Sequence, residues 1–193
     1  DLGTVEEWIQ AYLASHSILG TTMLWFATLP DGRPLSPGDW RRNCMATVGT
    51  HDVPTVAGFW TGHQVTVRAD LHLLTRPEQE ERESAAAAVA AWSAALIAEG
   101  LLPAGGPAGP ADLTVALYGY LARTPALLIG VSLADAVGDT RSQNIPGTVD
   151  EYPNWRVPLC DEAGAPVLLE DLARHSLLLA VTRAAAPGSR ACD

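Results

Sequence analysis

The sequence contains no lysine, and all 12 of its basic residues are arginines. This absence excludes a lysine that forms a Schiff base with a substrate and the lysine of a phosphate-binding loop. Acidic residues number 22, so the formal net charge is −10. A chain this acidic is poorly suited to the phosphates of nucleic acids or to an anionic membrane surface, and we expect neither as a partner.

Cysteine is also scarce. The three cysteines, Cys44, Cys160 and Cys192, are widely spaced and odd in number, and no Cys-x-x-Cys pair occurs. This pattern predicts free thiols in a reducing compartment and disfavours a zinc ribbon or a disulfide framework. No apolar run approaches the roughly 20 residues of a membrane span. We therefore expect a cytoplasmic protein.

Hydrophobic residues make up 48% of the chain, which is enough to build a substantial core. Apolar residues at helical spacing alternate along the chain with short β-prone runs. Thr4 followed by Glu7 predicts a capping box at the start of the first helix. The other expected elements are strands over residues 22–26, 45–48 and 126–133, and helices over residues 77–99, 112–122 and 169–184.

The alternation of strands and helices is typical of a (β/α) barrel or of a doubly wound sheet. The run over residues 126–133 is nearly all apolar, as expected of a parallel strand that is buried on both faces. No linker or internal repeat divides the chain. We therefore expect one α/β domain over residues 1–185 and a frayed tail over residues 186–193.

The most informative segment is the polar triplet at residues 50–52, which follows the apolar strand over residues 45–48. At the carboxyl end of a parallel strand, Asp52 can reach a substrate and His51 can hydrogen-bond a hydroxyl group. The alternative is that Asp52 caps a helix that starts near Pro54, and spacing alone favours neither interpretation. The histidines of this region do not indicate a metal site, because their spacing fits no helical pair and no zinc pattern.

Aromatic residues near the expected strand ends form a second group of candidates. Trp60 follows the triplet closely, and Tyr152 and Trp155 lie in a proline-rich loop after strand 126–133. Exposed aromatic faces with polar neighbours suit flat, hydroxyl-rimmed ligands such as sugars, although Trp155 could instead anchor its loop by packing. Three other tryptophans lie within apolar patterns and are expected in the core: Trp8, Trp25 and Trp92.

A polar set also follows the strand over residues 126–133. The set begins with Asp135 and continues with Asp139, Arg141, Gln143 and Asn144, and Pro146 and Gly147 follow in the same segment. Proline and glycine fix the backbone there, while asparagine offers both a donor and an acceptor. An ordinary turn is the alternative, but the position after a buried strand favours a site loop.

Four stretches of the chain, in this order, resemble amylomaltases, the 4-alpha-glucanotransferases of glycoside hydrolase family 77. They are DLGTV at the start, GTHDVPTVAG in the middle, and SLADAVGD and QNIPGTVDEYPNWRVPL later. The resemblance covers the whole chain except its tail, and several motifs in the same order are far more specific than one short match.

The resemblance implies a (β/α)8 TIM barrel that acts on α-1,4-glucans by a retaining double displacement, with two carboxyl groups as nucleophile and acid/base. It makes Asp52 a third catalytic carboxylate, which holds sugar hydroxyls and favours the charged transition state, and His51 its sugar-binding neighbour. The same resemblance assigns contacts in the substrate groove to four further residues: Asp135, Asn144, Pro146 and Gly147.

The chain departs from the family pattern at its start. In the family a glutamate, the acid/base, directly precedes the DLG turn, so here it would stand before Asp1, and the nucleophile farther upstream. We therefore expect the C-terminal part of the barrel, with about three strands, one of three catalytic carboxylates and no activity of its own. The implied partners are α-1,4-glucans and maltooligosaccharides, with no cofactor or metal. The alternatives are an α-amylase-like hydrolase and a non-catalytic glucan-binding or structural module.

Overall fold

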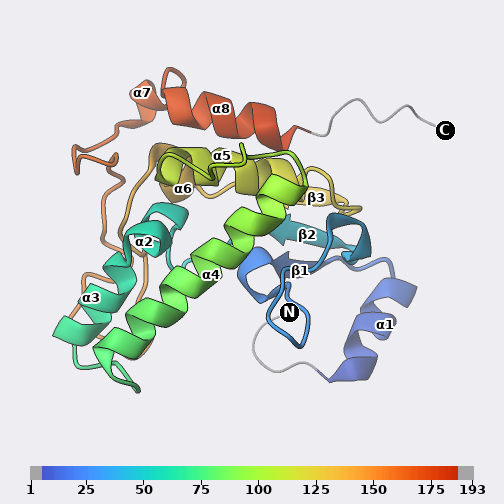
Figure 1. The fold of residues 1–193 in the computed structure, drawn as a ribbon, viewed down its shortest axis with the longest axis horizontal. Coiled ribbons are helices and arrows are strands. Elements are labelled where there is room, and N and C mark those ends of the chain that lie inside the picture. The colour runs from blue at the N-terminus through green and yellow to red at the C-terminus, as the bar shows by residue number, and fades with distance from the viewer. Residues whose placement is uncertain (1–5, 187–193) are drawn as a thin grey trace.

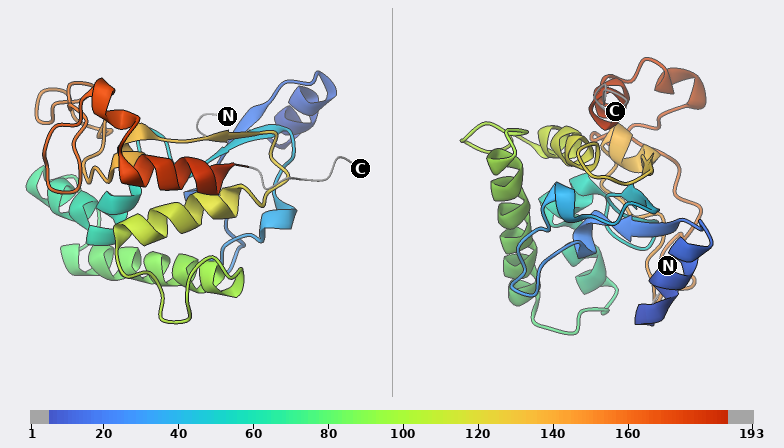
Figure 2. Two further views of the ribbon diagram at one scale, coloured as in Figure 1. Left: turned by 90° about the horizontal axis from the view of Figure 1, so that it is seen from above. Right: turned by 90° about the vertical axis from the view of Figure 1, so that its right-hand side faces the viewer.

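The computed structural model describes residues 6–186 (Figure 1). Helix α1 (Glu7–Ser15) lies where a helix was expected, while the predicted cap at Thr4 lies outside the described residues. The prediction that Trp8 is a core residue is wrong, because Trp8 is 63% exposed. Helix α1 stands at the periphery of the molecule (Figure 1, Figure 2). The Trp8 ring packs edge-on against Tyr12 of the same helix.

A three-stranded parallel sheet confirms the prediction of an α/β protein with parallel strands. Strands β1 (Gly20–Met23), β2 (Cys44–Thr47) and β3 (Leu128–Gly130) lie in this order, with Gly20 opposite Cys44 and Met45 opposite Leu128. The strand expected over residues 22–26 ends early, because Leu24–Phe26 form a 3-10 turn that buries Leu24 completely in the core.

Strand β3 corrects the expectation of a long strand that is buried on both faces. It has three residues, and Leu128 is 53% exposed because β3 pairs with β2 alone in the described sheet. The chain then turns at Ser132 into helix α6 (Leu133–Val137), whose N-terminus the Ser132 side chain caps. Asp135 therefore lies on a short helix and not at the end of a strand.

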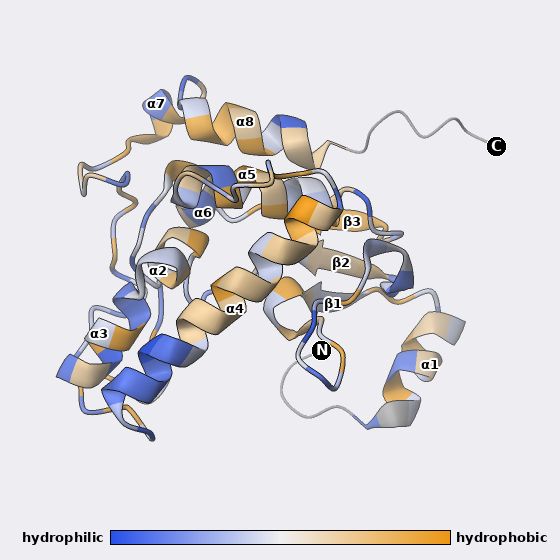
Figure 3. Ribbon diagram, viewed as in Figure 1, coloured by the Kyte–Doolittle hydropathy of each residue, from blue (hydrophilic) through white to orange (hydrophobic). Residues whose placement is uncertain are grey.

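A helical layer covers one face of the sheet. It contains α4 (Glu78–Ala98), α5 (Pro110–Leu121) and α8 (Ser176–Ala185), and α5 packs against both α4 and α8. Helix α4 is charged in its first turns and apolar toward its C-terminal end (Figure 3). The expected helix over residues 77–99 is confirmed.

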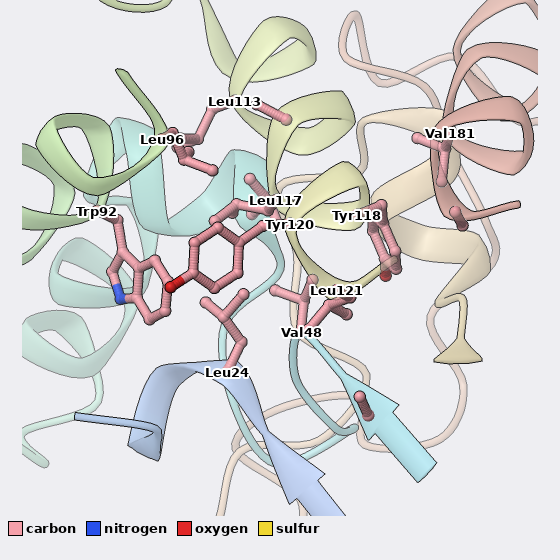
Figure 4. Packing of buried hydrophobic residues seen from close by; sticks show 14 of the residues in the cluster. Leu24, Val48, Trp92, Leu96, Leu113, Leu117, Tyr118, Tyr120, Leu121 and Val181 are labelled. Atoms are coloured by element: carbon pink, nitrogen blue, oxygen red, sulfur yellow. The ribbon is translucent and has the colours of Figure 1, made fainter. Parts of the chain in front are cut away.

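The core lies between this helical layer and strands β1 and β2 (Figure 4). Ala46 and Val48 of the β2 region point into it. Because side chains alternate along a strand, Met45 and Thr47 face the other side of the sheet, where they line a pocket. The residues of the core that are labelled in Figure 4 are Leu24, Val48, Trp92, Leu96, Leu113, Leu117, Tyr118, Tyr120, Leu121 and Val181.

Two short helices follow β2, and two more end the described chain. Helices α2 (Val56–Thr61) and α3 (His63–Asp70) are separated by Gly62, which has a φ of 68°. The single helix expected over residues 169–184 is instead α7 (Leu169–Leu172) followed by α8, with a break between them. Within residues 6–186, no helix combines the length and the hydrophobicity that crossing a membrane requires.

Candidate functional site

The segments that follow β2 and β3 carry most of the predicted site residues, and Asn144 joins the two. Its backbone N–H donates to the His51 carbonyl at 3.1 Å, and its Nδ2 donates to Oδ1 of Asp52 at 2.6 Å. Asn144 and Asp52 are 92 residues apart in the sequence, so only the fold brings them together. A carboxylate, an imidazole and an amide therefore share one polar cluster at the carboxyl edge of the sheet.

The structure decides against the helix-cap alternative for Asp52. Helix α2 begins at Val56, and its cap is Thr55, whose Oγ1 accepts from the Gly58 N–H at 3.0 Å. The Val56 N–H donates to the carboxylate of Asp135 at 2.8 Å. Thr55 and Asp135 thus accept from N–H groups of the first turn of α2, whereas Asp52 does not cap it and its side chain remains 45% exposed.

An aromatic ring extends the cluster on the side of His51. Nε2 of His51 lies 3.3 Å from Oδ2 of Asp52, and the His51 ring lies 4.6 Å from the Trp155 ring at an interplanar angle of 48°. Trp155 is 65% exposed and has a φ of 62°, in the left-handed region that a bulky residue rarely adopts. An exposed ring in an unfavourable backbone conformation is typical of a functional site.

The loop that carries Asn144 is held by its own side chains. Asn154 Oδ1 accepts from the Ile145 N–H at 2.9 Å, and Asn154 Nδ2 donates to Oγ1 of Thr148 at 2.7 Å. Gly147 makes the turn between them with a φ of 91°. Asn154 was not among the predicted site residues. The stretch Pro-Asn-Trp around it is typical of a loop, but it does not predict which groups Asn154 hydrogen-bonds.

Two pockets border the cluster. One, between α3 and the Asn144 loop, is lined by Asp52, Asn144 and Pro146 together with Tyr152. The other has a volume of about 290 Å³ and lies over the strand ends. Its polar lining combines hydroxyl, imidazole, amide and carboxyl groups that can bind a ligand rich in hydroxyls: Thr47, Thr50, His51, Thr55, Ser132, Asp135 and Gln143. Sequence reasoning had not singled out Ser132.

Asp135 lies deeper than the other predicted site residues, at 3% exposure. Besides the bond from Val56, it accepts a hydrogen bond from the Tyr118 hydroxyl at 2.9 Å. Burial raises the pKa of Asp135 to about 6, while the hydrogen bonds from Val56 and Tyr118 act in the opposite direction. Burial also raises the pKa of Tyr118 above its ordinary value, reinforced by the Asp135 charge.

Trp60 does not join the cluster. It lies on α2, packs against the core and lines a separate pocket with Arg82 and Val89 of α4. In the described part of the chain, no three or more histidine, cysteine, aspartate or glutamate side chains are grouped so that they could hold a metal ion.

Comparison with known proteins identifies the family. A family model described as 4-alpha-glucanotransferase, of glycoside hydrolase family 77, matches residues 1–162. The chain belongs to this 4-alpha-glucanotransferase family. The matched range contains every predicted site residue, from His51 to Trp155.

Relatives within the 4-alpha-glucanotransferase family are longer than this chain. The 4-alpha-glucanotransferase of Mycobacterium tuberculosis is 48% identical over 100% of this chain, which covers 28% of that protein. The Haemophilus influenzae 4-alpha-glucanotransferase is 31% identical over 80% of the chain, or 23% of its own length. The chain therefore spans about a quarter of the relatives that it matches.

Solved structures agree with this assignment. Amylomaltase from Corynebacterium glutamicum matches 97% of the chain with a TM-score of 0.90 and 35% identity, and the match covers 28% of that structure. Amylomaltase from Streptococcus agalactiae, solved in complex with acarbose, matches 94% of the chain with a TM-score of 0.51 and 19% identity. The second likeness concerns the fold alone.

Proposed function

We propose that this chain is the C-terminal part of the (β/α)8 barrel of a cytoplasmic 4-alpha-glucanotransferase, which transfers α-1,4-glucan segments between maltooligosaccharides. The observation that carries the proposal is the cluster in which Asn144, His51 and Trp155 surround the exposed carboxylate of Asp52. The cluster lies at the carboxyl ends of parallel strands, the edge that holds the active site in barrel enzymes.

Asp52 acts in this proposal as the third carboxylate of a retaining double displacement. In such a reaction one carboxylate forms a glycosyl-enzyme and a second carboxyl group serves first as acid and then as base, about 5–5.5 Å away. Asp52 binds hydroxyls of the reacting sugar, and its negative charge stabilises the oxocarbenium-like transition state. A sugar hydroxyl then takes the place of water as the acceptor.

The nucleophile and the acid/base are proposed to come from the rest of the enzyme. The chain spans about 28% of its mycobacterial relatives, and Asp52 and Asp135 are the only carboxylates among the described residues that line the two pockets at the site. Asp135 is buried and accepts two hydrogen bonds from the protein itself. We infer that the chain alone is inactive and that the transfer reaction needs no cofactor or metal.

The surrounding residues are proposed to bind the glucan. His51 and Asn144 donate hydrogen bonds to sugar hydroxyls, while the exposed ring of Trp155 packs against a sugar face. Pro146 and Gly147 shape the loop that borders the groove. Trp60 and Asp135 have the least support as glucan contacts, because one packs against α4 and the other is buried.

The test uses the full-length enzyme that contains this chain, incubated with maltotriose. A glucanotransferase yields glucose together with a ladder of longer and shorter glucans. Glucose and maltose without any longer product would favour an α-amylase-like hydrolase and contradict the proposal. Acarbose, present in the Streptococcus agalactiae amylomaltase complex, provides a binding probe, and we expect it to inhibit the reaction competitively.

A glucan-binding module is the second candidate, because the Trp155 ring is exposed beside His51. Titration of this chain with maltoheptaose, followed by tryptophan fluorescence, distinguishes the two. We expect weak or no saturable binding, because the proposed groove is completed by the rest of the barrel. Tight saturable binding would support an independent binding module.

A further inference from the structure

The loop that carries Asn144 and Trp155 is long and contains no helix or strand over residues 140–159. A segment of this length loses considerable conformational entropy when it is fixed in one conformation. Yet Nδ2 of Asn144 is held 2.6 Å from Asp52. Contacts outside the site must therefore contribute to holding the loop in place.

A buried carboxylate joins the two ends of this loop. Asp139 is 1% exposed. At the start of the loop its Oδ1 accepts from the backbone N–H of Arg141 at 2.9 Å and from Nε of Arg141 at 3.0 Å. Its Oδ2 accepts from Nη2 of Arg141 at 2.8 Å and, at the end of the loop, from the Cys160 N–H at 3.0 Å.

The guanidinium group of Arg141 adds a second connection between the loop ends. Nη2 also donates to the Pro158 carbonyl at 2.6 Å. The hydrogen bonds to Asp139 raise the pKa of Arg141 above its ordinary value. We call Asp139, Arg141, Pro158 and Cys160 the loop clasp.

The loop clasp is also fixed relative to the segment that carries Asp52. A Cβ atom placed on Gly58 of α2 would lie 2.4 Å from the carbonyl oxygen of Thr140, so α2 and the start of the loop touch through their backbones. From α6, Asp135 holds the first N–H of α2 at Val56. The Asp52 segment and the Asn144 loop are therefore both held in place by contacts with α6 and with the residues that follow it.

We propose that Asp139 is a positioning residue for glucan transfer and acts through Asn144. The loop clasp holds Asn144 where Nδ2 meets the Asp52 carboxylate, and so keeps that carboxylate aimed at the reacting sugar. This inference rests on the proposed transferase function. A substitution far from the reacting atoms that displaces a catalytic group by about 1 Å can lower the rate by on the order of a hundredfold. Disruption of the loop clasp is therefore expected to have a large effect on turnover.

The test measures kcat and KM for maltotriose disproportionation by the full-length enzyme, well below the thermal midpoint of every variant. The variants are Asp139→Asn, Arg141→Lys, Asn144→Ala and the two double substitutions that combine each clasp variant with Asn144→Ala. Lysine keeps the charge of Arg141 but cannot bond at several points as a planar fork does. The control is Val181→Ala, which opens the buried core on α8 outside the loop clasp.

We expect Asp139→Asn to lower kcat by on the order of tenfold to a hundredfold. In the Asn144→Ala background the same change is expected to cost less than about twofold, because residues that act as a unit are not additive. Val181→Ala is expected to lower the thermal midpoint and leave kcat unchanged. If Asp139→Asn does not fold, Arg141→Lys is judged by the same two comparisons.

Two results would overturn the positioning role: a kcat near the wild-type value in the folded clasp variants, or an equally large loss in the Asn144→Ala background. Either result would leave Asp139 as a purely structural residue. Failure of the proposed function is a different outcome, because the wild-type enzyme would then form no glucan that is longer than maltotriose.

Discussion

The helical interior and the site at the sheet edge involve the same strands but are stabilised by different interactions. Leu96, Leu117 and Val181 are fully buried in the interior, where apolar side chains pack without directional bonds. At the edge, the Asp52 side chain is 45% exposed and Trp155 is 65% exposed, and the cluster is held by hydrogen bonds and ring contacts. The interior is stabilised by apolar packing, whereas the site depends on the orientation of its polar and aromatic side chains.

The backbone differs between the two regions as well. The interior consists of regular helices and strands, while the site contains a tryptophan and a glycine with positive φ, Trp155 and Gly147. A left-handed conformation costs a bulky residue roughly 1–2 kcal/mol. The molecule thus tolerates strain at the edge because the interior supplies stability, and substitutions in the two regions should separate stability from activity.

The largest expected effect is on the interior. Leu117→Ala removes a fully buried side chain of α5 and leaves a cavity, so we expect the free energy of unfolding to fall by about 2–5 kcal/mol. Chemical denaturation of the full-length enzyme measures the change, and kcat of the folded enzyme should not move. Leu117→Met, which nearly conserves volume, is the control and should cost less than about 1.5 kcal/mol. A large drop in kcat for Leu117→Ala would contradict the separation of stability in the interior from activity at the site.

The second effect is the converse. Asp52→Asn keeps an oxygen that can accept from Asn144 but removes the charge, so we expect kcat to fall by on the order of 10²–10³ with an unchanged thermal midpoint. The matched control is Asp150→Asn, an exposed aspartate of the same loop that lines neither pocket. Near-normal turnover by Asp52→Asn would contradict the catalytic role.

The third effect tests Asp135, which lies between the two regions. Its pKa is raised from 3.8 to about 6 in the folded protein, so the folded state holds the proton more tightly than the unfolded state does. The stabilisation that this proton contributes is complete below about pH 4 and is lost as the pH rises through about 6. It amounts to about 3 kcal/mol.

Asp135→Asn removes this titration. We therefore expect the stability of the wild type relative to Asp135→Asn to decrease between about pH 4 and pH 6, and then to stay constant. Urea unfolding of both full-length proteins across this range measures the difference. A difference that does not change with pH would show that Asp135 titrates near its ordinary pKa in the folded protein.

The smallest effect concerns Trp155. Trp155→Asn places a residue that tolerates positive φ at this position, so relief of strain offsets the lost ring contact and stability should change by no more than about 1 kcal/mol. The KM for maltotriose should rise about fivefold, because a ring contact of about 1 kcal/mol with sugar and His51 is lost. Trp155→Phe retains a ring and should keep most of the affinity. An unchanged KM for Trp155→Asn would make Trp155 a loop anchor.

The interior was largely predictable because its signals are local. The helix expected over residues 77–99 is α4, whose boundaries follow from its glutamate-rich first turn and from Gly100 with a φ of 67°. Strand β2 lies within one residue of its expected position. The predictions for Trp8 and β3 were wrong because an apolar pattern indicates that a face can be buried, but it does not indicate which element covers that face.

Most residues of the candidate cluster could be named from the sequence, but their arrangement in space could not. His51, Asp52, Asn144 and Trp155 were expected, and the fold brings them into one cluster. Trp60 was expected beside them because it is near in sequence, yet the turn of α2 directs it toward α4. The loop clasp could not be predicted, because the bond from the Cys160 N–H to Asp139 spans 21 residues of irregular chain.

The long separation between Asp52 and Asn144 has a consequence for how the protein is made. A ribosome that adds about 5–20 residues per second needs roughly 5 to 20 s to synthesise the 92 positions that separate them. During that interval β2, α4 and α5 can already pack, whereas the Asp52 segment has no partner loop. A nascent chain that stalls there would carry an interior that still lacks α8 and a sheet edge that still lacks the Asn144 loop, which is the form that a chaperone would meet.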